Sequence, residues 1–193
     1  YKSLLWMTTG VVLYRLGKSQ LSELGGLYRS MPITTAFFLI GSLSMALPGT
    51  CGFTSKNIII HAIEYEHLFW PWLILEMCAI GIFLAVAVRL PYFLFFGKSD
   101  STEKILDAPR TMIAGMSLLG FFCLFFGISP GRLYDILPYE IDFHPYKLAK
   151  VTIVLQWIFA SGVAFLFLKK WQQPQRSILL DFDWFYRKGG IAI

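Results

Sequence analysis

Charged side chains are scarce in this sequence. Asp, Glu, Lys and Arg together make up 15% of its 193 residues, whereas a soluble domain usually carries about 25%. Hydrophobic residues account for 56% of the chain and fall in long runs. Such runs are typical of segments that cross a lipid bilayer. The scarcity of charge therefore excludes a disordered chain and an ordinary cytosolic enzyme, and it predicts an integral membrane protein.

Cysteine is rare, and the signatures of soluble enzymes are missing. Cys51, Cys78 and Cys123 lie in or beside apolar runs, with no CxxC and no histidine at metal-ligand spacing. We therefore interpret the three thiols as small buried apolar groups, not as a disulfide framework or a metal centre. The chain also lacks a GxGxxG, a Walker loop, an HExxH and a nucleophile elbow. We expect no metal, no cofactor and no catalytic residue.

The positive charge of the chain follows its apolar runs. Lys and Arg exceed Asp and Glu by 17 to 12, which makes the net charge +5. Many of the basic residues lie between or just beyond apolar runs, as Arg15, Lys18, Lys169 and Lys170 do. This distribution is typical of membrane topology signals and not of nucleic-acid binding. We expect lipid contacts and no nucleic acid.

Apolar segments of this length predict an all-α polytopic helix bundle. Backbone polar groups in lipid must be satisfied within the segment, which favours helices. We expect about six membrane segments, at residues 1–14, 32–48, 53–69, 71–96, 111–129 and 149–168. Six crossings would place the connection 15–31 on the side of 130–147, opposite 97–110 and the tail. That assignment inverts if residues 32–69 cross the membrane only once.

A helix-breaking stretch separates the second and third segments. It contains Pro48, Gly49 and Gly52 and has almost no polar side chains. Proline removes a backbone donor and glycine loosens the chain, so a helix is interrupted here. Because a surface loop would be more polar, we predict that the break lies at or near membrane depth. Discontinuous helices of this kind face protein or a water-filled cavity.

Ionisable residues inside apolar runs are candidates for proton or ion transfer. Lys56 follows the break, His61 and His67 follow Lys56, and Glu76 lies six residues inside Trp70. Burying such a group costs about 2.5–3.5 kcal/mol at a helix centre. Lys56 could exchange protons with water in a cavity or could snorkel to an interface. For His61, His67 and Glu76, a relay role and a structural role both remain open.

Helical spacing separates these candidates into two groups. On one continuous helix, Lys56, Ile60, Ile63 and His67 share a stripe. Lys56 and His67 would then lie roughly 16 Å apart along the axis, a separation that suits a water-bridged relay. His61 lies about 140° round from Lys56 and faces elsewhere.

Several segments resemble a known membrane-protein family. The run Leu-Gly-Gly-Leu-Tyr-Arg-Ser-Met-Pro at residues 24–32 and the run 46–56, which ends Gly-Phe-Thr-Ser-Lys, carry this resemblance. They resemble the antiporter-like subunits shared by respiratory complex I and the Mrp-type multisubunit cation/proton antiporters. Residues 89–97 and 181–186 are similar to the D-type subunits of the cation/proton antiporters in particular.

The resemblance implies a division of the chain and roles for two lysines. Residues 1–168 would be the C-terminal part of an antiporter-like transmembrane domain, and residues 169–193 a polar, amphipathic tail. Lys56 would be the ionisable residue of the second discontinuous helix, and Lys2 a relay residue on a central hydrophilic axis. The family's other ionisable groups would precede Tyr1, so we expect the chain to be part of a longer protein.

The resemblance leaves three functions open. The first is a proton-translocating subunit of a multisubunit Na⁺/H⁺ antiporter, with other membrane subunits, protons and a monovalent cation as partners. The second is a proton-pumping membrane-arm subunit of an NADH-quinone oxidoreductase or a membrane hydrogenase, in which the chain would belong to an enzyme without performing its redox chemistry. The third is a non-transporting structural subunit. We expect the bacterial inner membrane as its location.

Overall fold

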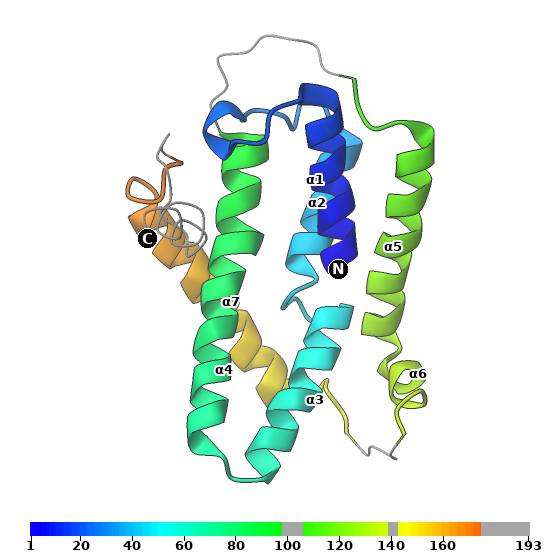
Figure 1. The fold of residues 1–193 in the computed structure, drawn as a ribbon. Coiled ribbons are helices and arrows are strands. Elements are labelled where there is room, and N and C mark those ends of the chain that lie inside the picture. Colours follow the sequence, from blue (N-terminus) through cyan, green and yellow to red (C-terminus); the bar gives the residue numbers. More distant parts are fainter. Residues whose placement is uncertain (98–105, 139–142, 175–193) are drawn as a thin grey trace, which may run out of the picture.

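The structure is a computed structural model that describes residues 1–97, 106–138 and 143–174. These residues form helices and turns, and no strand occurs among them. Most of the helices run side by side in a bundle, and α7 crosses behind it at a tilt (Figure 1). The prediction of an all-α helix bundle is confirmed.

The bundle contains six helices of twelve or more residues in its described part. They are α1 (Lys2–Leu16), α2 (Pro32–Leu43), α3 (Cys51–Tyr65), α4 (Phe69–Ile82), α5 (Arg110–Ile128) and α7 (Leu148–Leu168). A single turn at Leu21–Glu23 and the short α6 (Pro130–Tyr134) lie in the connections. Beyond Ile82, α4 continues through two π-helical stretches, Phe83–Arg89 and Tyr92–Phe96.

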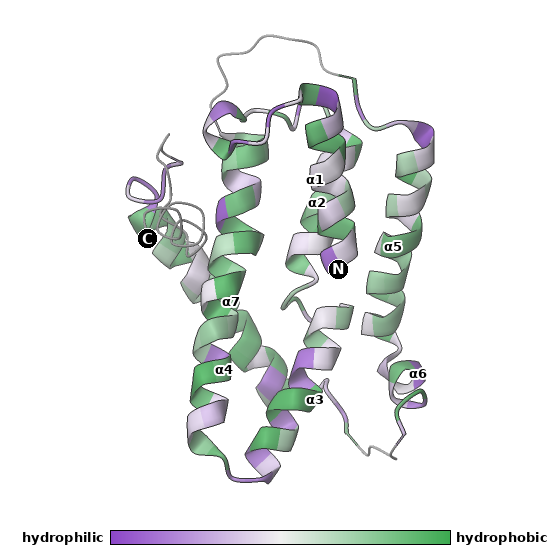
Figure 2. Cartoon of the chain, in the orientation of Figure 1, coloured by the Kyte–Doolittle hydropathy of each residue, from purple (hydrophilic) through white to green (hydrophobic). Residues whose placement is uncertain are grey.

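Among the described residues, three helices are long and apolar enough to cross a membrane. They span Phe69–Phe96, Arg110–Ile128 and Leu148–Leu168. Most of their residues are hydrophobic, and many hydrophilic residues lie in the connections, at helix ends and on α3 (Figure 2). Large apolar side chains such as Ile74, Phe121 and Phe167 are therefore exposed, as expected where lipid covers the surface.

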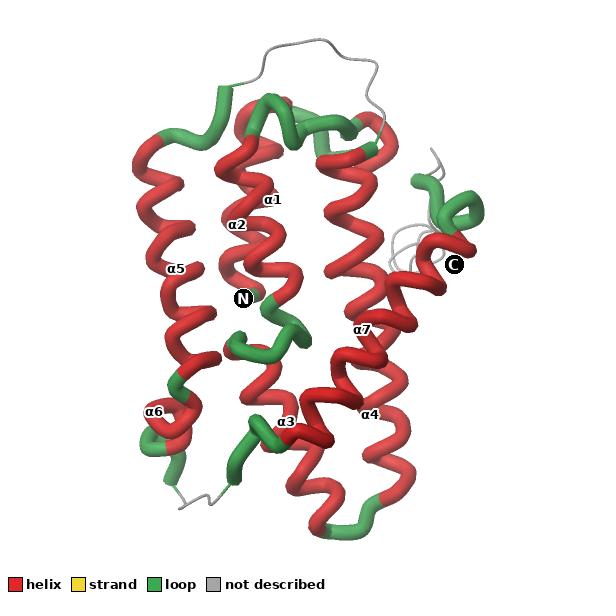
Figure 3. The backbone as a smooth tube through the Cα atoms, turned by 180° about the vertical axis from the view of Figure 1, so that it is seen from behind, coloured by secondary structure: helices red, strands yellow, loops and turns green. Residues whose placement is uncertain are grey.

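The second and third predicted segments together form one crossing. α2 ends at Leu43 and α3 begins at Cys51, and the two helices follow one another end to end with an irregular connection between them (Figure 3). The predicted end of the second segment at residue 48 is therefore wrong, since it lies five residues beyond the end of α2 at Leu43. Residues 44–50 belong to the break itself, because Pro48 and Gly49 cannot continue the helix.

This single crossing changes the predicted topology. The connection from α1 to α2 and the upper end of α4 lie at the same end of the bundle, and the hairpin from α3 to α4 lies at the other (Figure 1). The end of α7 lies beside the upper part of α4, since Arg89 donates to the Gln172 carbonyl at 3.2 Å. The described ends of the connection 97–110 and the described start of the tail thus lie at the same end of the bundle as residues 15–31, so the prediction that they lie opposite is wrong and the inverted assignment holds.

The core of the described bundle lies where α1, α2 and α5 meet. Leu4, Val11, Met31 and Met116 form one fully buried cluster, and Phe38 and Phe95 belong to a second that joins α2 to the end of α4. The Phe38 and Phe95 rings meet edge to face at 5.1 Å. These contacts hold the first half of the discontinuous helix against its neighbours.

Asp107 caps the start of that helix from a distant part of the chain. Its carboxylate accepts hydrogen bonds from the Ile33 N–H at 2.8 Å and from the Thr34 hydroxyl at 2.6 Å. Arg15 donates to the Asp107 backbone carbonyl at 2.7 Å. The first N–H groups of a helix have no partner within it, and a carboxylate satisfies them and complements the helix dipole.

Two opposing effects set the pKa of Asp107. Partial burial by itself would raise it, but hydrogen bonds from the Thr34 hydroxyl and from the Ala108, Ile33 and Thr34 N–H groups lower the pKa of Asp107 below its ordinary value. The capping carboxylate is therefore ionised at neutral pH. Because the pKa is lower in the folded state, the cap stabilises the fold above the unfolded pKa, and this stabilisation is lost as the pH falls through the folded pKa.

We expect Asp107→Ala to lower the free energy of unfolding by about 1 kcal/mol at neutral pH, because the substitution removes a helix cap. Thermal unfolding of the purified protein in detergent, followed by circular dichroism, measures the effect. Asp135→Ala, at an exposed site outside the long helices, is the matched control and should leave the unfolding temperature unchanged. A stability difference that persists once the pH is below the folded-state pKa of Asp107 would contradict the assignment, since the cap is then protonated in both states.

Candidate functional site

The break between α2 and α3 depends on glycine at two positions. Gly49 has a φ of 92°, in the region that residues with a Cβ avoid. A Cβ on Gly52 would lie 2.1 Å from the Ser44 carbonyl oxygen, so the start of α3 packs directly on the end of α2. On α5, a Cβ at Gly127 would lie 2.2 Å from the Gly49 carbonyl oxygen. The break is thus enclosed by backbone on two sides, as the prediction of a break within the bundle requires.

Local hydrogen bonds satisfy the carbonyl groups that the break exposes. The Thr50 hydroxyl donates to the Leu47 carbonyl at 2.7 Å and lies 3.1 Å from the Ser44 carbonyl. The Gly52 N–H donates to the Ser44 carbonyl at 3.1 Å. An unsatisfied backbone group in lipid costs several kcal/mol, and these bonds remove that cost.

Lys56 lies on the second turn of α3, and its ammonium group pairs with Glu76 of α4. The Nζ–Oε2 distance is 3.1 Å, and the two side chains are 28% and 17% exposed. A charge within a membrane segment needs a counter-charge or water to offset its desolvation. The structure therefore brings together two of the predicted pathway residues, which lie twenty positions apart in the sequence.

Two cavities border this ion pair. One, of about 260 Å³, is lined by Tyr1, Gly52, Lys56 and Phe83, among others. The other, of about 40 Å³, lies between Lys56, Glu76 and the α7 residues Trp157 and Ser161. Each exceeds the roughly 10–15 Å³ that a single water needs. Lys56 lines both cavities, so its ammonium group can be reached from two directions.

Lys2, the second predicted lysine, opens α1 and is exposed. Its neighbour Tyr1 lines the larger cavity beside Lys56. The start of α1 therefore lies next to the break, which is where a lateral relay toward Lys56 would begin. Lys2 lies near this cavity and is not one of the residues that line it.

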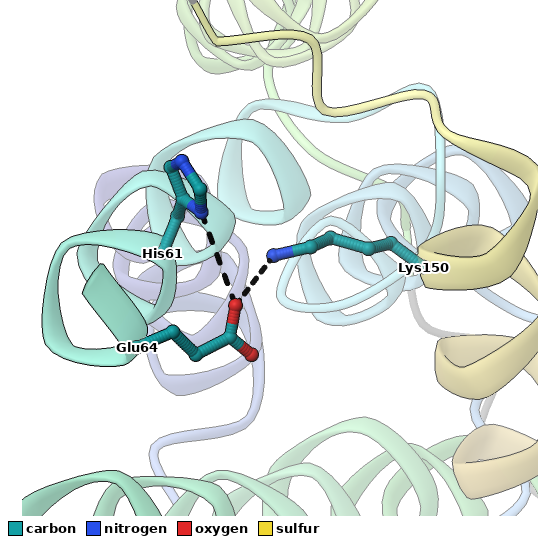
Figure 4. Close-up of polar contacts among 3 residues, drawn as sticks. All are labelled: His61, Glu64 and Lys150. Atoms are coloured by element: carbon teal, nitrogen blue, oxygen red, sulfur yellow. Dashed lines mark hydrogen bonds and ion pairs between the residues drawn. The ribbon is translucent and has the colours of Figure 1, made fainter. Parts of the chain in front are cut away.

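His61 belongs to a separate cluster near the end of α3. Glu64 accepts from Lys150 of α7 at 3.0 Å, and the His61 Nδ1 lies 3.9 Å from the same carboxylate oxygen (Figure 4). The His61 ring stacks on Phe143 at 4.7 Å. His61 thus faces α7 and the segment before it, away from Glu76, as its position on the helix predicts.

The predicted stripe from Lys56 to His67 is wrong at its far end. α3 ends at Tyr65, and His67 is exposed in the hairpin with a φ of 54°. The left-handed backbone turns the chain toward α4, so His67 does not continue the helical face of Lys56. Periodicity alone does not locate this end, because residues 53–69 contain no proline or glycine to stop a helix.

Sequence reasoning missed three contributors to the site. Glu64 and Lys150 pair across 86 positions, and Ser161 is buried beside the smaller cavity. Lys150 lies two residues inside α7. Its position as a charged residue at the start of an apolar run was the feature of the sequence that could have indicated a role in the site. Ser161 carried no signal, because small hydroxyl residues are common in membrane helices.

A discontinuous helix with an ion pair beside its break is typical of membrane proteins that move ions or protons. The described residues contain no group of three or more His, Cys, Asp or Glu that could hold a metal. Residues 1–83 match the family described as NADH:quinone oxidoreductase/Mrp antiporter, TM. Over these residues the match confirms the resemblance noted in the sequence.

Curated relatives extend the match beyond these residues. NADH-ubiquinone oxidoreductase chain 5 of Sus scrofa is 28% identical over 132 residues, which cover 63% of this chain and 22% of the relative. F(420)H(2) dehydrogenase subunit L of Methanosarcina mazei is 33% identical over 138 residues, 66% of this chain and 20% of the relative. NADH-ubiquinone oxidoreductase chain 5 of Phytophthora infestans is 34% identical, over 66% of this chain and 20% of the relative. The chain thus spans about a fifth of the length of these relatives.

These relatives refine two predictions. Their names are those of oxidoreductase subunits, so the specific resemblance to the D-type antiporter subunits is not confirmed. Residues 181–186, which carried part of that resemblance, lie outside the described residues, as does most of the predicted amphipathic tail. The relatives come from an animal, an oomycete and an archaeon, so the bacterial inner membrane is not confirmed, although the integral membrane location is supported.

We expect Gly52→Ala to destabilise the protein by about 1–3 kcal/mol, because the new methyl group would overlap the Ser44 carbonyl. Gly81→Ala is the matched control, since a Cβ there meets nothing within 4 Å. Alanine is the better helix former, so Gly81→Ala should be neutral or stabilising. Thermal unfolding of both variants in detergent measures their stabilities. Equal changes in unfolding temperature for Gly52→Ala and Gly81→Ala would contradict the close contact at the break.

We expect the Lys56–Glu76 pair to show a coupling energy of about 1 kcal/mol in a double-mutant cycle. Either Lys56→Gln or Glu76→Gln leaves a partly buried charge without its counter-charge, whereas the double variant removes both. The free energies of unfolding of the four proteins provide the measurement. The combination of Glu76→Gln with Lys170→Gln, at an exposed site, should be additive. Additivity of the Lys56 and Glu76 changes would show that the pair contributes nothing.

Proposed function

We propose that this chain is part of a proton-translocating subunit in the membrane arm of a redox-driven, NADH:quinone oxidoreductase-like complex. One observation carries the proposal. A lysine stands one turn after a helix break, in contact with a glutamate, and lines cavities on both sides. An intramembrane ionisable residue of this kind is a candidate proton carrier.

The ion pair supplies a means of coupling. A protonated Lys56 is stabilised by the Glu76 carboxylate, and a positive charge that arrives nearby destabilises it. Electrostatic interaction between neighbouring charges can therefore drive release of the Lys56 proton into an adjoining cavity. The break at Pro48, Gly49 and Gly52 places backbone groups of the discontinuous helix beside this lysine.

We assign the remaining predicted residues to the surroundings of this lysine. Lys2 would pass charge laterally along the bundle toward the break, and Glu76 would hold Lys56 in place between transfers. His61 would take part in proton transfer farther along α3. His67 has the weakest case, because it lies in the hairpin and off the helical face of Lys56.

The relatives favour the redox-driven complex over a Na⁺/H⁺ antiporter. The similar proteins are subunits of an NADH-ubiquinone oxidoreductase and of an F(420)H(2) dehydrogenase. Antiport remains the second candidate, because the description of the matching family includes the Mrp antiporter. In either case other membrane subunits, lipid and protons are the partners we propose, with a monovalent cation added for antiport.

The basic residues suggest an orientation. Arg15, Lys18, Arg29 and Arg110 lie at the end of the bundle that holds the connection from α1 to α2, and Arg132 and Lys147 lie at the other. Positive residues are enriched on the cytoplasmic side of membrane proteins. We therefore propose that the α1–α2 connection faces the compartment in which the protein is made, across an energy-converting membrane such as the bacterial inner membrane.

We expect Lys56→Ala to abolish proton pumping driven by an electron donor, because it removes the group that would carry the proton. The intact complex in sealed membrane vesicles is the sample, and a pH-sensitive dye in the lumen measures the flux. Lys170→Ala, an exposed lysine beyond the end of α7, controls for general loss of positive charge and should pump normally. Immunoblots confirm equal assembly.

The same vesicles separate the two candidate functions. A proton flux that requires the electron donor supports the redox-driven complex. A flux that a Na⁺ gradient drives without a donor supports the antiporter. Pumping by Lys56→Ala at the rate of the unmodified complex would refute the role of Lys56 in both.

A further inference from the structure

A second polar stripe runs along α3 beside the one that holds Lys56. Asn57, His61 and Glu64 follow one another at spacings of four and three residues, so they share one face of the helix. Lys56 pairs with α4, whereas Glu64 pairs with Lys150 of α7. The two stripes meet at Lys56 and Asn57, which are adjacent in the sequence. The second stripe therefore leads from the turn of Lys56 to the end of α3.

Aromatic side chains cover this stripe. One turn before Asn57, Phe53 stacks on Tyr146 with ring centres 5.5 Å apart. One turn after it, His61 stacks on Phe143 at 4.7 Å. The Tyr134 ring lies 6.5 Å from Phe143, and its hydroxyl interacts electrostatically with that of Tyr146. Asn57 thus lies between the Phe53–Tyr146 and His61–Phe143 contacts along α3, and Tyr134 lies near Phe143 and Tyr146.

Both of these residues have a buried polar atom that lacks a partner. Asn57 is 5% exposed and Tyr134 is 8% exposed. Within the described residues, neither the Asn57 amide nitrogen nor the Tyr134 hydroxyl finds a hydrogen-bond partner. An unsatisfied buried group costs about 1–3 kcal/mol, and in folded proteins ordered water usually satisfies such groups.

The Tyr134 hydroxyl suits a water partner. Burial, together with the neighbouring Tyr146, raises the pKa of Tyr134 to about 12, so the hydroxyl keeps its proton at neutral pH. A neutral tyrosine hydroxyl both donates and accepts hydrogen bonds, and an asparagine amide nitrogen donates two. Each of the two groups can therefore hydrogen-bond to a water molecule.

The stripe ends in a charged cluster that reaches solvent. Glu64 accepts from Lys150 at 3.0 Å, and its side chain is 42% exposed. His61 approaches the same carboxylate from one turn earlier on α3 (Figure 4). Glu64 lies about 12 Å from Lys56 along the axis of α3. Asn57 and Tyr134 occupy the buried part of the route between these two charged sites.

We infer that Asn57 and Tyr134 hold water between Lys56 and the His61–Glu64–Lys150 cluster, and that this hydrated stripe is the port through which Lys56 exchanges protons with the aqueous phase at the α3–α4 hairpin. The role as a port rests on the proposed function of Lys56. The water site stands on the buried unpartnered atoms and is tested separately.

Pulsed hydroxyl-radical labelling of the intact complex tests the water site. Radicals formed from bound water label the side chains next to it. Tyr134 should be labelled well above Met116, which is fully buried and chemically the more reactive side chain. Asn57→Leu should reduce labelling of Tyr134 severalfold, because an apolar side chain of similar volume displaces the water. Ile58→Leu, the matched change at the next position of α3, should not.

Donor-driven proton pumping in vesicles tests the port. Asn57→Leu and Tyr134→Phe should each slow pumping severalfold, and Glu64→Gln should slow it as well. Tyr134→Phe removes a single oxygen atom and keeps the ring, so it serves where Asn57→Leu fails to assemble. Tyr65→Phe, on an exposed tyrosine of the same region, is its matched control and should pump normally.

Together, the labelling and the pumping measurements show which part of the proposal is wrong when an expected result is not obtained. Labelling of Tyr134 no greater than that of Met116 would overturn the water site. Strong labelling with normal pumping in Asn57→Leu and Tyr134→Phe, while Lys56→Ala does not pump, would overturn the port and leave the function of Lys56 in place. Normal pumping in Lys56→Ala would overturn the proposed function and the port together, and the labelling would still decide the water site.

Discussion

The requirement that backbone polar groups be satisfied inside lipid governs this structure. It permits a helix to break within the bundle only where other groups replace the lost hydrogen bonds. Thr50 and the Gly52 N–H supply these bonds at the end of α2. Gly127 lets the backbone of α5 pack directly against the Gly49 carbonyl in the break. The need to satisfy backbone groups at the break accounts for the position of α5 and for the glycines there. It also accounts for the location of the site beside the break.

The second constraint is the cost of charge in the same surroundings. Two ionisable groups of α3 each meet a partner from a different helix. Lys56 meets Glu76 of α4, and Glu64 meets Lys150 of α7. These pairs hold α3 between its two neighbours, and they also leave groups whose charge can change when a nearby charge moves. Under the proposed function, proton transfer would therefore depend on the same contacts as stability, and substitutions there would affect both.

Much of the helix content was predictable because lipid imposes it. Apolar runs predicted the three long spans to within about two residues, and Pro48 with Gly49 predicted the break. The end of α3 was not predictable in this way, since His67 turns the chain without proline or glycine. The cap on α2 was not predictable either. Asp107 follows Thr34 by 73 positions, and nothing near Pro32 indicates which distant carboxylate satisfies the helix start.

The sequence by itself determined that this is an integral membrane protein, that one of its helices is broken, and that Lys56 stands beside the break. Composition and local backbone chemistry are enough for these conclusions, because they act over a few residues. Only the tertiary structure decided that α2 and α3 follow one another end to end, that Lys56 pairs with Glu76, and that Asn57 and Tyr134 are buried. These contacts depend on how the helices pack, because packing decides which counter-charge or hydrogen-bond partner lies within reach of a group in lipid.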